Sequence, residues 1–397
     1  MLAVPQRVLP VIVFSQFAGT SLWFAVNAVM PDLQAAWGLP ASAVGTLTSA
    51  VQLGFVAGTL AFALLMVADR FSPSRVFCSC ALLGAAANAL TVLLDRQWTL
   101  LLGLRFCVGF LLAGIYPVGM KIAASWYREG LGAAMGVLIG ALVLGTALPH
   151  GLRALGLAAG AAAWQTVVLA VSAFAALGGL ATLLLVPVSP QRVSGGSGAR
   201  FTPRALGVIW HDRAVRASVF GYFGHMWELY AFFVLLPLVL ATRLAGADVS
   251  EAAFWIIGSG FVGCVAGGLL VRRFGSARVA ALQLAASGTC ALLTPWMLTA
   301  PGAVFMLWLL VWGITVSGDS PQFSTLTAQN APREIAGSVL TFANSIGFAI
   351  TVVSIELFVR GAQAWPLGHV LPWLALGPVL GLWMFRPLWR QPSATAG

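Results

Sequence analysis

The sequence predicts an all-α membrane protein with twelve membrane-spanning helices, and its composition and length support this. Hydrophobic residues make up 60% of the 397 residues and charged residues only 8%, and the mean hydropathy is +0.94. A soluble domain is nearer half apolar and a quarter charged, and a disordered chain needs low hydrophobicity with high charge. Because a hydrocarbon core about 30 Å thick needs about 20 residues per helix, this chain holds about a dozen spans.

Apolar runs between charged residues, prolines and glycine clusters locate the expected spans. They are residues 8–30, 42–67, 75–94, 99–125, 132–152, 163–187, 215–241, 251–271, 277–298, 302–327, 336–359 and 368–386. The first run follows Arg7 and could be mistaken for a signal peptide. Its 23-residue length, and its counterpart in the second half, predict a retained helix.

The arginines predict the orientation of the chain. Fifteen fall in alternate connections that begin with the N-terminus, and four fall in the other connections. The positive-inside rule therefore predicts a multi-pass protein of the cytoplasmic (inner) membrane with both termini in the cytoplasm. Residues 189–214, which include Gly195-Gly196-Ser197-Gly198, are expected to form a flexible linker with a short surface helix near its end. The linker separates a six-helix domain, 1–188, from another, 215–397.

The composition also restricts the energy source of any transport. The single lysine, Lys121, lies between Met120 and Ile122, so the chain lacks the Gly-Lys-Ser/Thr end of a phosphate-binding loop. Uphill movement of a solute would need an ion gradient or a partner ATPase. The five cysteines lie in apolar runs, and Cys78-Ser79-Cys80 lacks the CxxC spacing of a redox or zinc pair. We expect neither a metal site nor a cofactor.

The two halves of the chain repeat each other at an offset of 203 to 206 residues. The matched landmarks, in order, are Pro31 with Pro237, the loop 69–75 with the loop 272–278, Pro117 with Pro321, and Arg128-Glu129 with Arg333-Glu334. Such a repeat predicts two parallel six-helix bundles related by an axis along the membrane normal.

With this repeat, the chain resembles the major facilitator superfamily of secondary transporters over essentially its whole length. Asp69-Arg70 with Arg75 is similar to the family's G-x-x-x-D-R-x-G-R-R loop, although Leu65 and Ser72 stand where its glycines belong. The resemblance implies that Asp69, Arg70 and Arg75 act in gating.

Two further motifs extend the resemblance. Arg105-x-x-x-Gly109 is similar to the family's fourth-helix Arg-Gly motif, which adds Arg105 to the gating residues. Gly136, Gly145 and Pro149 are similar to the glycine-proline motif of antiporters, with the proline one place early. The resemblance also implies that spans 1, 4, 7 and 10 line a central cavity.

Ionisable residues inside spans are candidates for function because burying a charge in hydrocarbon is costly. Glu228 lies mid-way along the seventh span, and its repeat partner is the uncharged Leu22. His225 shares its helix face, and Asp319 lies in the tenth span beside Gly318 and Pro321. Burial favours the protonated form of a carboxyl, so we expect Glu228 and Asp319 to carry protons, together with His225. The alternative is a structural hydrogen bond to a neighbouring helix.

Polar and aromatic residues concentrate on the four expected cavity-lining spans. The expected solute-binding residues are Gln16, Trp23, Asn27, Tyr116, Lys121, Trp227, Tyr230 and Gln322. For Lys121 two other readings stay open, because its long side chain could reach the cytoplasmic face or pair with a carboxylate.

We therefore expect a proton-coupled secondary transporter for a small solute, working by alternating access, with export by antiport favoured. The alternatives are an uptake symporter for an organic anion, or a membrane sensor with the same fold. An enzyme is not expected, because the chain has four scattered histidines and no HExxH motif. The expected partners are the solute, protons and the bilayer, without nucleic acid despite the net charge of +10. The chain is expected to act as a monomer.

Overall fold

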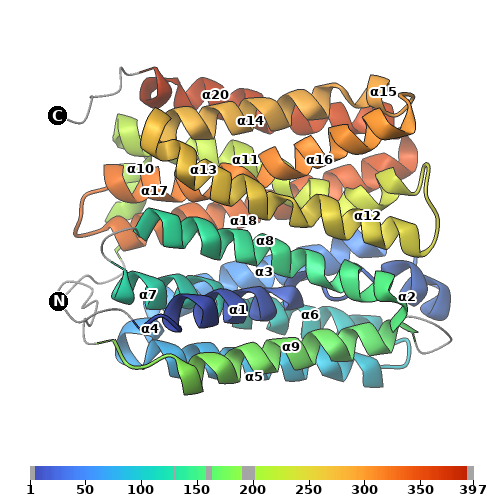
Figure 1. Cartoon of the computed structure of the whole chain (residues 1–397), viewed down its shortest axis with the longest axis horizontal. Helices are drawn as coiled ribbons and strands as arrows, with labels where there is room; N and C mark the ends of the chain where they lie inside the picture. Colours follow the sequence, from blue (N-terminus) through green and yellow to red (C-terminus); the bar gives the residue numbers. More distant parts are fainter. Residues whose placement is uncertain (1–4, 128–130, 158–162, 190–201, 391–397) are drawn as a thin grey trace.

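The computed structural model describes residues 5–127, 131–157, 163–189 and 202–390, and it confirms the helical membrane fold (Figure 1). In these ranges ten helices are long and apolar enough to cross a membrane, and Val8–Phe24 is a shorter apolar helix. α14 (Ser276–Leu292) with α15 (Thr294–Met297) supplies the twelfth span. No described residue is in a β-strand. The expected linker glycines and Arg128-Glu129 lie outside the described residues.

The first six spans follow their expected ranges closely, except for the first. They are formed by α1 (Val8–Thr20) with η1 (Ser21–Phe24), α3 (Ala43–Leu64), α5 (Pro73–Leu90) with η2 (Thr91–Leu93), α6 (Trp98–Leu112) with α7 (Tyr116–Trp126), α8 (Leu131–Leu152) with η3 (Arg153–Leu157), and α9 (Ala163–Leu185). The short helices α2 (Met30–Trp37) and α4 (Val67–Arg70) lie in connections.

The second six spans begin after a short surface helix, α10 (Arg204–His211), which confirms the helix expected there. They are formed by α11 (Arg213–Leu240), α12 (Ala247–Gly258) with α13 (Gly260–Phe274), α14 with α15, α16 (Gly302–Gly318) with α17 (Ser320–Asn330), α18 (Ala336–Ala364), and α19 (Leu367–Val370) with η4 (Leu371–Ala375) and α20 (Leu376–Trp389).

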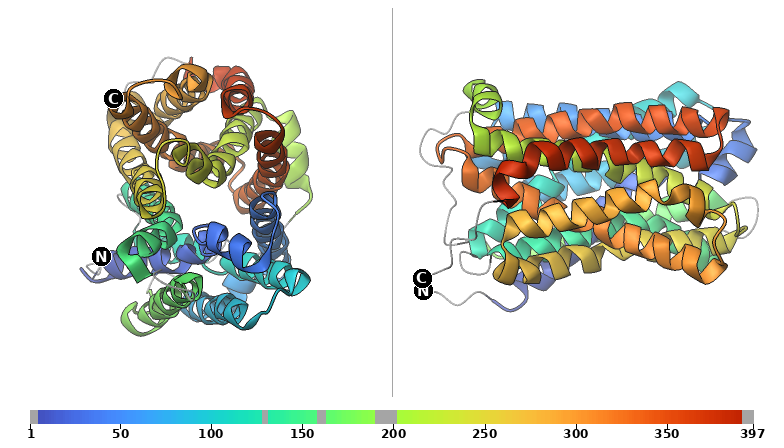
Figure 2. Two further views of the ribbon diagram at one scale, coloured as in Figure 1. Left: turned by 90° about the vertical axis from the view of Figure 1, so that its right-hand side faces the viewer. Right: turned by 90° about the horizontal axis from the view of Figure 1, so that it is seen from above.

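The helices run side by side, and the two halves of the chain form two neighbouring bundles (Figures 1 and 2). We call the end at which α1 begins and α20 ends the basal end, and the opposite end the apical end. α4, α7 and α10 lie at the basal end, whereas α2 and α15 lie at the apical end (Figure 1). The two halves meet where α3 packs along α18 and where α8 packs along α12 and α13.

Glycines allow the same close helix crossing in both halves. In the first half, a Cβ on Gly54 would collide with the carbonyl oxygen of Phe106, and one on Gly109 with that of Val51. In the second half, Gly313 packs in the same way on the carbonyl oxygen of Ile256. Gly109 and Gly313 are 204 residues apart, which is the offset of the sequence repeat. The second and fourth spans of each half therefore cross backbone to backbone.

The first span stops being α-helical earlier than its sequence predicts. α1 ends at Thr20 and a 3₁₀ turn follows, whereas we expected one helix to residue 30. The Thr20 hydroxyl donates to the Gln16 carbonyl at 2.7 Å, and the Ser21 hydroxyl donates to the Ala18 carbonyl at 2.6 Å. Side-chain hydrogen bonds of this kind compete with the regular backbone ladder. They leave the carbonyls after Ser21 free for another partner.

Candidate functional site

Glu228 lies inside the second bundle and accepts two hydrogen bonds. Its carboxylate accepts from Trp312 Nε1 at 2.7 Å and from Ser287 Oγ at 2.8 Å. These donors come from α16 and α14, so the carboxyl joins three helices of the second bundle. The Trp312 ring also packs on Phe232, with ring centroids 4.5 Å apart. All polar contacts of Glu228 among the described residues are thus made within one half.

His225 and Asp319 form a second buried pair in the same bundle. His225 Nδ1 lies 2.8 Å from Asp319 Oδ1, and both side chains are at most 1% exposed. Asp319 stands between α16 and α17, where the tenth span is interrupted ahead of Pro321. With its amide oriented toward its acceptors, Gln322 donates to the Gly318 carbonyl at 2.7 Å. Gln322 therefore satisfies backbone freed by the interruption.

Lys121 lies at the basal end, where it forms an ion pair with Asp69. Its ammonium group also donates to the Ala68 carbonyl at 2.7 Å. The side chain of Asp69 is 51% exposed and that of Lys121 23%, while Arg70 and Arg75 are exposed at the same end. Of the readings left open for Lys121, the structure shows pairing with a carboxylate. The pair joins α7 to α4 within the first half.

We expect Lys121→Gln to leave the affinity for a transported solute unchanged, because the ammonium group is engaged by Asp69 away from the bundle centre. The partly exposed pair should contribute less than about 1 kcal/mol to stability. The double variant Lys121→Gln/Asp69→Asn should therefore melt like either single variant, since the two residues share one interaction. Melting curves and solute titrations of the three variants check this. A weakened affinity in Lys121→Gln alone would return the lysine to the solute site.

Arg105 is completely buried in the first bundle. Its guanidinium donates to the Leu22 carbonyl at 3.0 Å, to the Trp23 carbonyl at 2.7 Å and to Asn88 Oδ1 at 3.0 Å. The two carbonyls belong to η1, where the first span leaves the α-helix. Arg105 on α6 thus holds the break in the first span and fixes the backbone of Trp23.

The polar residues of the first span mostly have partners in their own half. Trp23 Nε1 donates to Gln52 Oε1 at 3.0 Å, and Asn27 Nδ2 donates to Thr48 Oγ1 at 2.6 Å. Gln16 is buried, and neither of its amide atoms hydrogen bonds to a described residue. It packs on Gly119 of α7, where a Cβ would collide with its amide oxygen. Gln52 and Thr48 on α3 were not among the residues expected from the sequence.

Aromatic side chains from both halves meet mid-way between the bundles, and we call this group the central aromatic cluster: Trp23, Phe55, Tyr230 and Phe348. The Trp23 ring stacks on Phe348 with centroids 5.3 Å apart and on Tyr230 at 5.8 Å. Phe55 and Phe348 are 4.4 Å apart, and Tyr116 lies 6.4 Å from Phe55. The structure thus brings the expected residues Trp23, Tyr116 and Tyr230 together with two phenylalanines that the sequence did not single out.

Trp227 is not in this cluster. Its indole N–H donates to the Trp373 carbonyl at 3.3 Å, and its ring packs edge-on against Phe358, with centroids 5.7 Å apart. Trp227 thus contacts η4 and α18 of its own bundle. The sequence placed it near the solute because it neighbours Glu228, but successive residues of a helix point in different directions.

A polar bridge closes the gap between the halves at the apical end. The Arg153 guanidinium pairs with the Asp32 carboxylate at 2.9 and 3.1 Å, and it also donates to Ser250 Oγ at 2.8 Å. Asp32 and Arg153 belong to the first half, and Ser250 belongs to α12 of the second. Sequence patterns do not indicate this bridge, because Asp32 and Ser250 are 121 and 97 residues away from Arg153 in the chain.

We expect Ser250→Ala to shift the protein away from the apically closed arrangement, because it removes a hydrogen bond between the halves. A loss of about 1 kcal/mol would change the population ratio about fivefold. Distances between spin labels at Ala35 and Ala247, in a cysteine-free background, measure the ratio. Thr242→Ala is the matched control, since its hydroxyl bonds only the Val239 carbonyl of its own helix. Identical distance distributions in Ser250→Ala and Thr242→Ala would contradict a closing role for the bridge.

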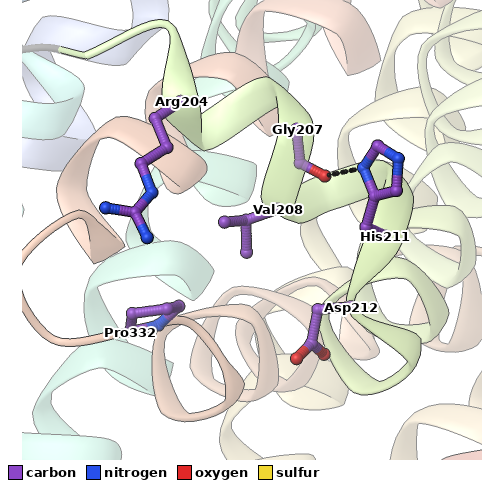
Figure 3. A pocket seen from close by; sticks show the side chains of 6 residues that line it. All are labelled: Arg204, Gly207, Val208, His211, Asp212 and Pro332. Carbon is purple, nitrogen blue, oxygen red and sulfur yellow. Dashed lines mark hydrogen bonds between the residues drawn. The ribbon is translucent and has the colours of Figure 1, made fainter.

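A hollow of ≈ 370 Å³ lies beside α10 at the basal surface (Figure 3). Arg204, Val208 and His211 of α10 line it together with Asp212 and Pro332. His211 Nδ1 is 2.8 Å from the Gly207 carbonyl oxygen of the same helix. This hollow is separate from the central aromatic cluster and holds none of the expected site residues.

Comparisons with known proteins agree with this architecture. The sequence profile of the Major Facilitator Superfamily matches residues 12–355, whereas a search of curated protein sequences finds no match. The human organic anion transporter MFSD10 superposes with a TM-score of 0.72 at 15% identity, over 96% of this chain and 99% of that one. The E. coli fucose:proton symporter FucP superposes with a TM-score of 0.68 at 16% identity, over 98% of this chain and 100% of that one. The proton:xylose symporter XylE superposes with a TM-score of 0.74 at 14% identity, over 96% of each chain. At these identities, the superpositions show a shared fold alone.

Proposed function

The chain belongs to the major facilitator superfamily of secondary transporters, and from this premise we propose that it couples movement of a small solute to movement of protons. The buried pair of His225 and Asp319 carries the proposal. A carboxyl and an imidazole 2.8 Å apart can share one proton, and separating them changes the charge that each side chain bears. Because Asp319 stands at the interruption of the tenth span, movement of α16 against α17 would alter that separation.

Glu228 is the second proton-carrying candidate in this proposal. Its two hydrogen-bond donors favour the ionised carboxylate, whereas its complete burial favours the protonated form. The loss of Trp312 or Ser287 as a partner during the cycle would favour uptake of a proton instead. Both candidate sites lie in the second bundle, apart from the central aromatic cluster. Movement of the proton would therefore be coupled to movement of the solute through the tilt of α11 and α16.

We propose export by exchange with protons as the direction of transport. The resemblance of Gly136, Gly145 and Pro149 on α8 to the antiporter motif supports it. Uptake by symport is the second candidate, because FucP and XylE are proton symporters of the same fold. The arginine distribution supports a basal end in the cytoplasm. We further propose that the protein acts as a monomer in the inner membrane.

Solute-induced proton flux tests coupling and direction together. The purified protein would be reconstituted into vesicles that contain a pH-sensitive dye, and candidate solutes would be added outside. Antiport predicts that the lumen becomes more alkaline as the solute enters, and symport predicts that it becomes more acidic. Solute accumulation without any change in luminal pH would refute proton coupling. Vesicles carrying Asp319→Asn supply the matched control.

A further inference from the structure

The interface between the two bundles holds the side chains that would contact a solute. In transporters built from repeats, the substrate site lies near the membrane midplane where the repeats meet. In this chain the central aromatic cluster lies where the two repeats meet, with Trp23 and Phe55 from the first half and Tyr230 and Phe348 from the second. The rings of Trp23 and Tyr230 are inclined by only 23°, and those of Trp23 and Phe348 by 22°. These near-parallel rings stack on one another and are at most 3% exposed, so a solute that binds here would replace contacts between them.

Phenol groups add hydrogen-bonding capacity beside these rings. Tyr230 belongs to the cluster, the Tyr116 ring lies 6.4 Å from that of Phe55, and Tyr222 packs on Gly347 next to Phe348. Each of the three tyrosines is at most 9% exposed. None of the three hydroxyls hydrogen bonds to a residue in the part of the chain that the structure describes. Each can therefore donate to or accept from a solute. The tyrosines come from α7 and α11, so they also span the two halves.

Three buried ionisable side chains, and Lys121 at the basal end, already have partners outside the cluster. Arg105 is bound to the carbonyls behind Trp23, and Glu228 is bound to Ser287 and Trp312. Asp319 is paired with His225, and Lys121 is paired with Asp69 at the basal end. Each of these contacts lies within one half. A charged solute at the interface would lose its hydration without gaining a counter-charge from any of these groups, which costs several kcal/mol.

We infer that the transported solute is an uncharged molecule with a flat aromatic ring and at least one hydrogen-bonding group. The ring would stack against Trp23 and Tyr230, and a tyrosine hydroxyl would bind the polar group. This inference rests on the proposed transport function and defines its substrate class. It differs from the alternative of an organic anion, because Lys121 is paired with Asp69 at the basal end.

Three naphthalene derivatives that differ in charge test the inference: 2-naphthol, 2-naphthoate and 2-naphthylmethylammonium. Their binding to the detergent-purified protein is measured by equilibrium dialysis at neutral pH, with empty micelles subtracted. We expect saturable binding of 2-naphthol at least about tenfold tighter than that of either charged probe. Equal or tighter binding of a charged probe, or no saturable binding of any probe, would overturn the inference.

Substitutions in the central aromatic cluster show whether 2-naphthol binds there. Trp23→Leu and Phe348→Leu should each weaken 2-naphthol binding about fivefold, because stacking partners are lost. Trp255→Leu is the matched control, since Trp255 is 61% exposed on the outer surface of α12. Melting curves show whether each variant is folded, and Tyr230→Phe preserves the ring if the larger changes unfold the protein. Affinities equal to that of Trp255→Leu would place the probe elsewhere and refute the assignment.

Dialysis uses no pH gradient, so its result is independent of coupling. Binding of 2-naphthol with transport that moves no protons would refute the proposed coupling and leave the solute class standing. Proton-coupled transport of 2-naphthoate would refute the solute class and leave the proposed coupling standing.

Discussion

Asp319→Asn is expected to reduce pH-gradient-driven transport to the level of protein-free vesicles while solute exchange continues. Asparagine has nearly the shape of aspartate, but it neither ionises nor attracts a proton from His225. The variant pair would no longer bind and release the coupled proton, so the pH gradient could not drive transport. Exchange needs no net proton movement, and the central aromatic cluster is built from other residues. Driven uptake and counterflow of the same solute measure the two activities.

Two further variants sharpen this test. Asp248→Asn makes the same chemical change at an exposed position near the start of α12, and it should behave like the wild type. In Glu228→Gln the amide oxygen can still accept from Trp312, and the amide NH2 group can donate to the Ser287 hydroxyl, so we expect part of the driven transport to survive. If Glu228→Gln abolishes driven transport and Asp319→Asn does not, the proton is carried by Glu228. Normal driven transport in both variants would refute coupling through either residue.

The architecture was accessible from sequence because it follows from local patterns. Apolar runs of sufficient length predict spans wherever they occur, and matched prolines such as Pro117 and Pro321 predict that the halves repeat each other. In the structure these prolines follow interruptions of the fourth and tenth spans, at residues 113–115 and at Asp319. The intramembrane charges could likewise be found one at a time, because a charged residue in an apolar run needs no structural context to be noticed.

The contact partners of these ionisable residues could not be predicted from the sequence, because each partner lies far from its residue along the chain. Trp312 is 84 residues from Glu228, and in the sequence it is one of 15 tryptophans in an apolar chain. Lys121 meets Asp69 only because α7 runs back to the basal end beside α4. Phe55 and Phe348 are two of 24 phenylalanines, and only the packing of α3 on α18 distinguishes them. Sequence patterns identify ionisable groups, whereas tertiary contacts decide which remain available for a solute.

The shortened first helix shows the same principle and leads to the largest stability effect that we expect. α1 ends at Thr20, although residues 8–30 form one apolar run. A non-helical segment inside a membrane is tolerated only when its backbone groups find other partners. Arg105 supplies them from α6, 82 and 83 residues away in the sequence. The break and the buried arginine are therefore one structural unit.

Arg105→Gln should lower the free energy of unfolding by about 3 kcal/mol, because it leaves the buried carbonyls of Leu22 and Trp23 short of donors. Arg105→Lys keeps the charge but not the forked geometry, so its loss should be intermediate. Melting temperature and denaturant unfolding in detergent measure both variants. Arg96→Gln is the matched control, since that arginine is exposed and makes one 3.3 Å hydrogen bond to the Ala36 carbonyl.

The same variants connect stability to the solute site. If Arg105 fixes η1, then Arg105→Lys should also weaken 2-naphthol binding, because Trp23 is attached to the segment that loosens. Asn88→Ala removes one acceptor of Arg105 and leaves both carbonyl contacts in place. It should therefore destabilise the protein with little effect on binding. Wild-type stability in Arg105→Gln, or equal losses of binding in Arg105→Lys and Asn88→Ala, would show that the arginine does not position Trp23.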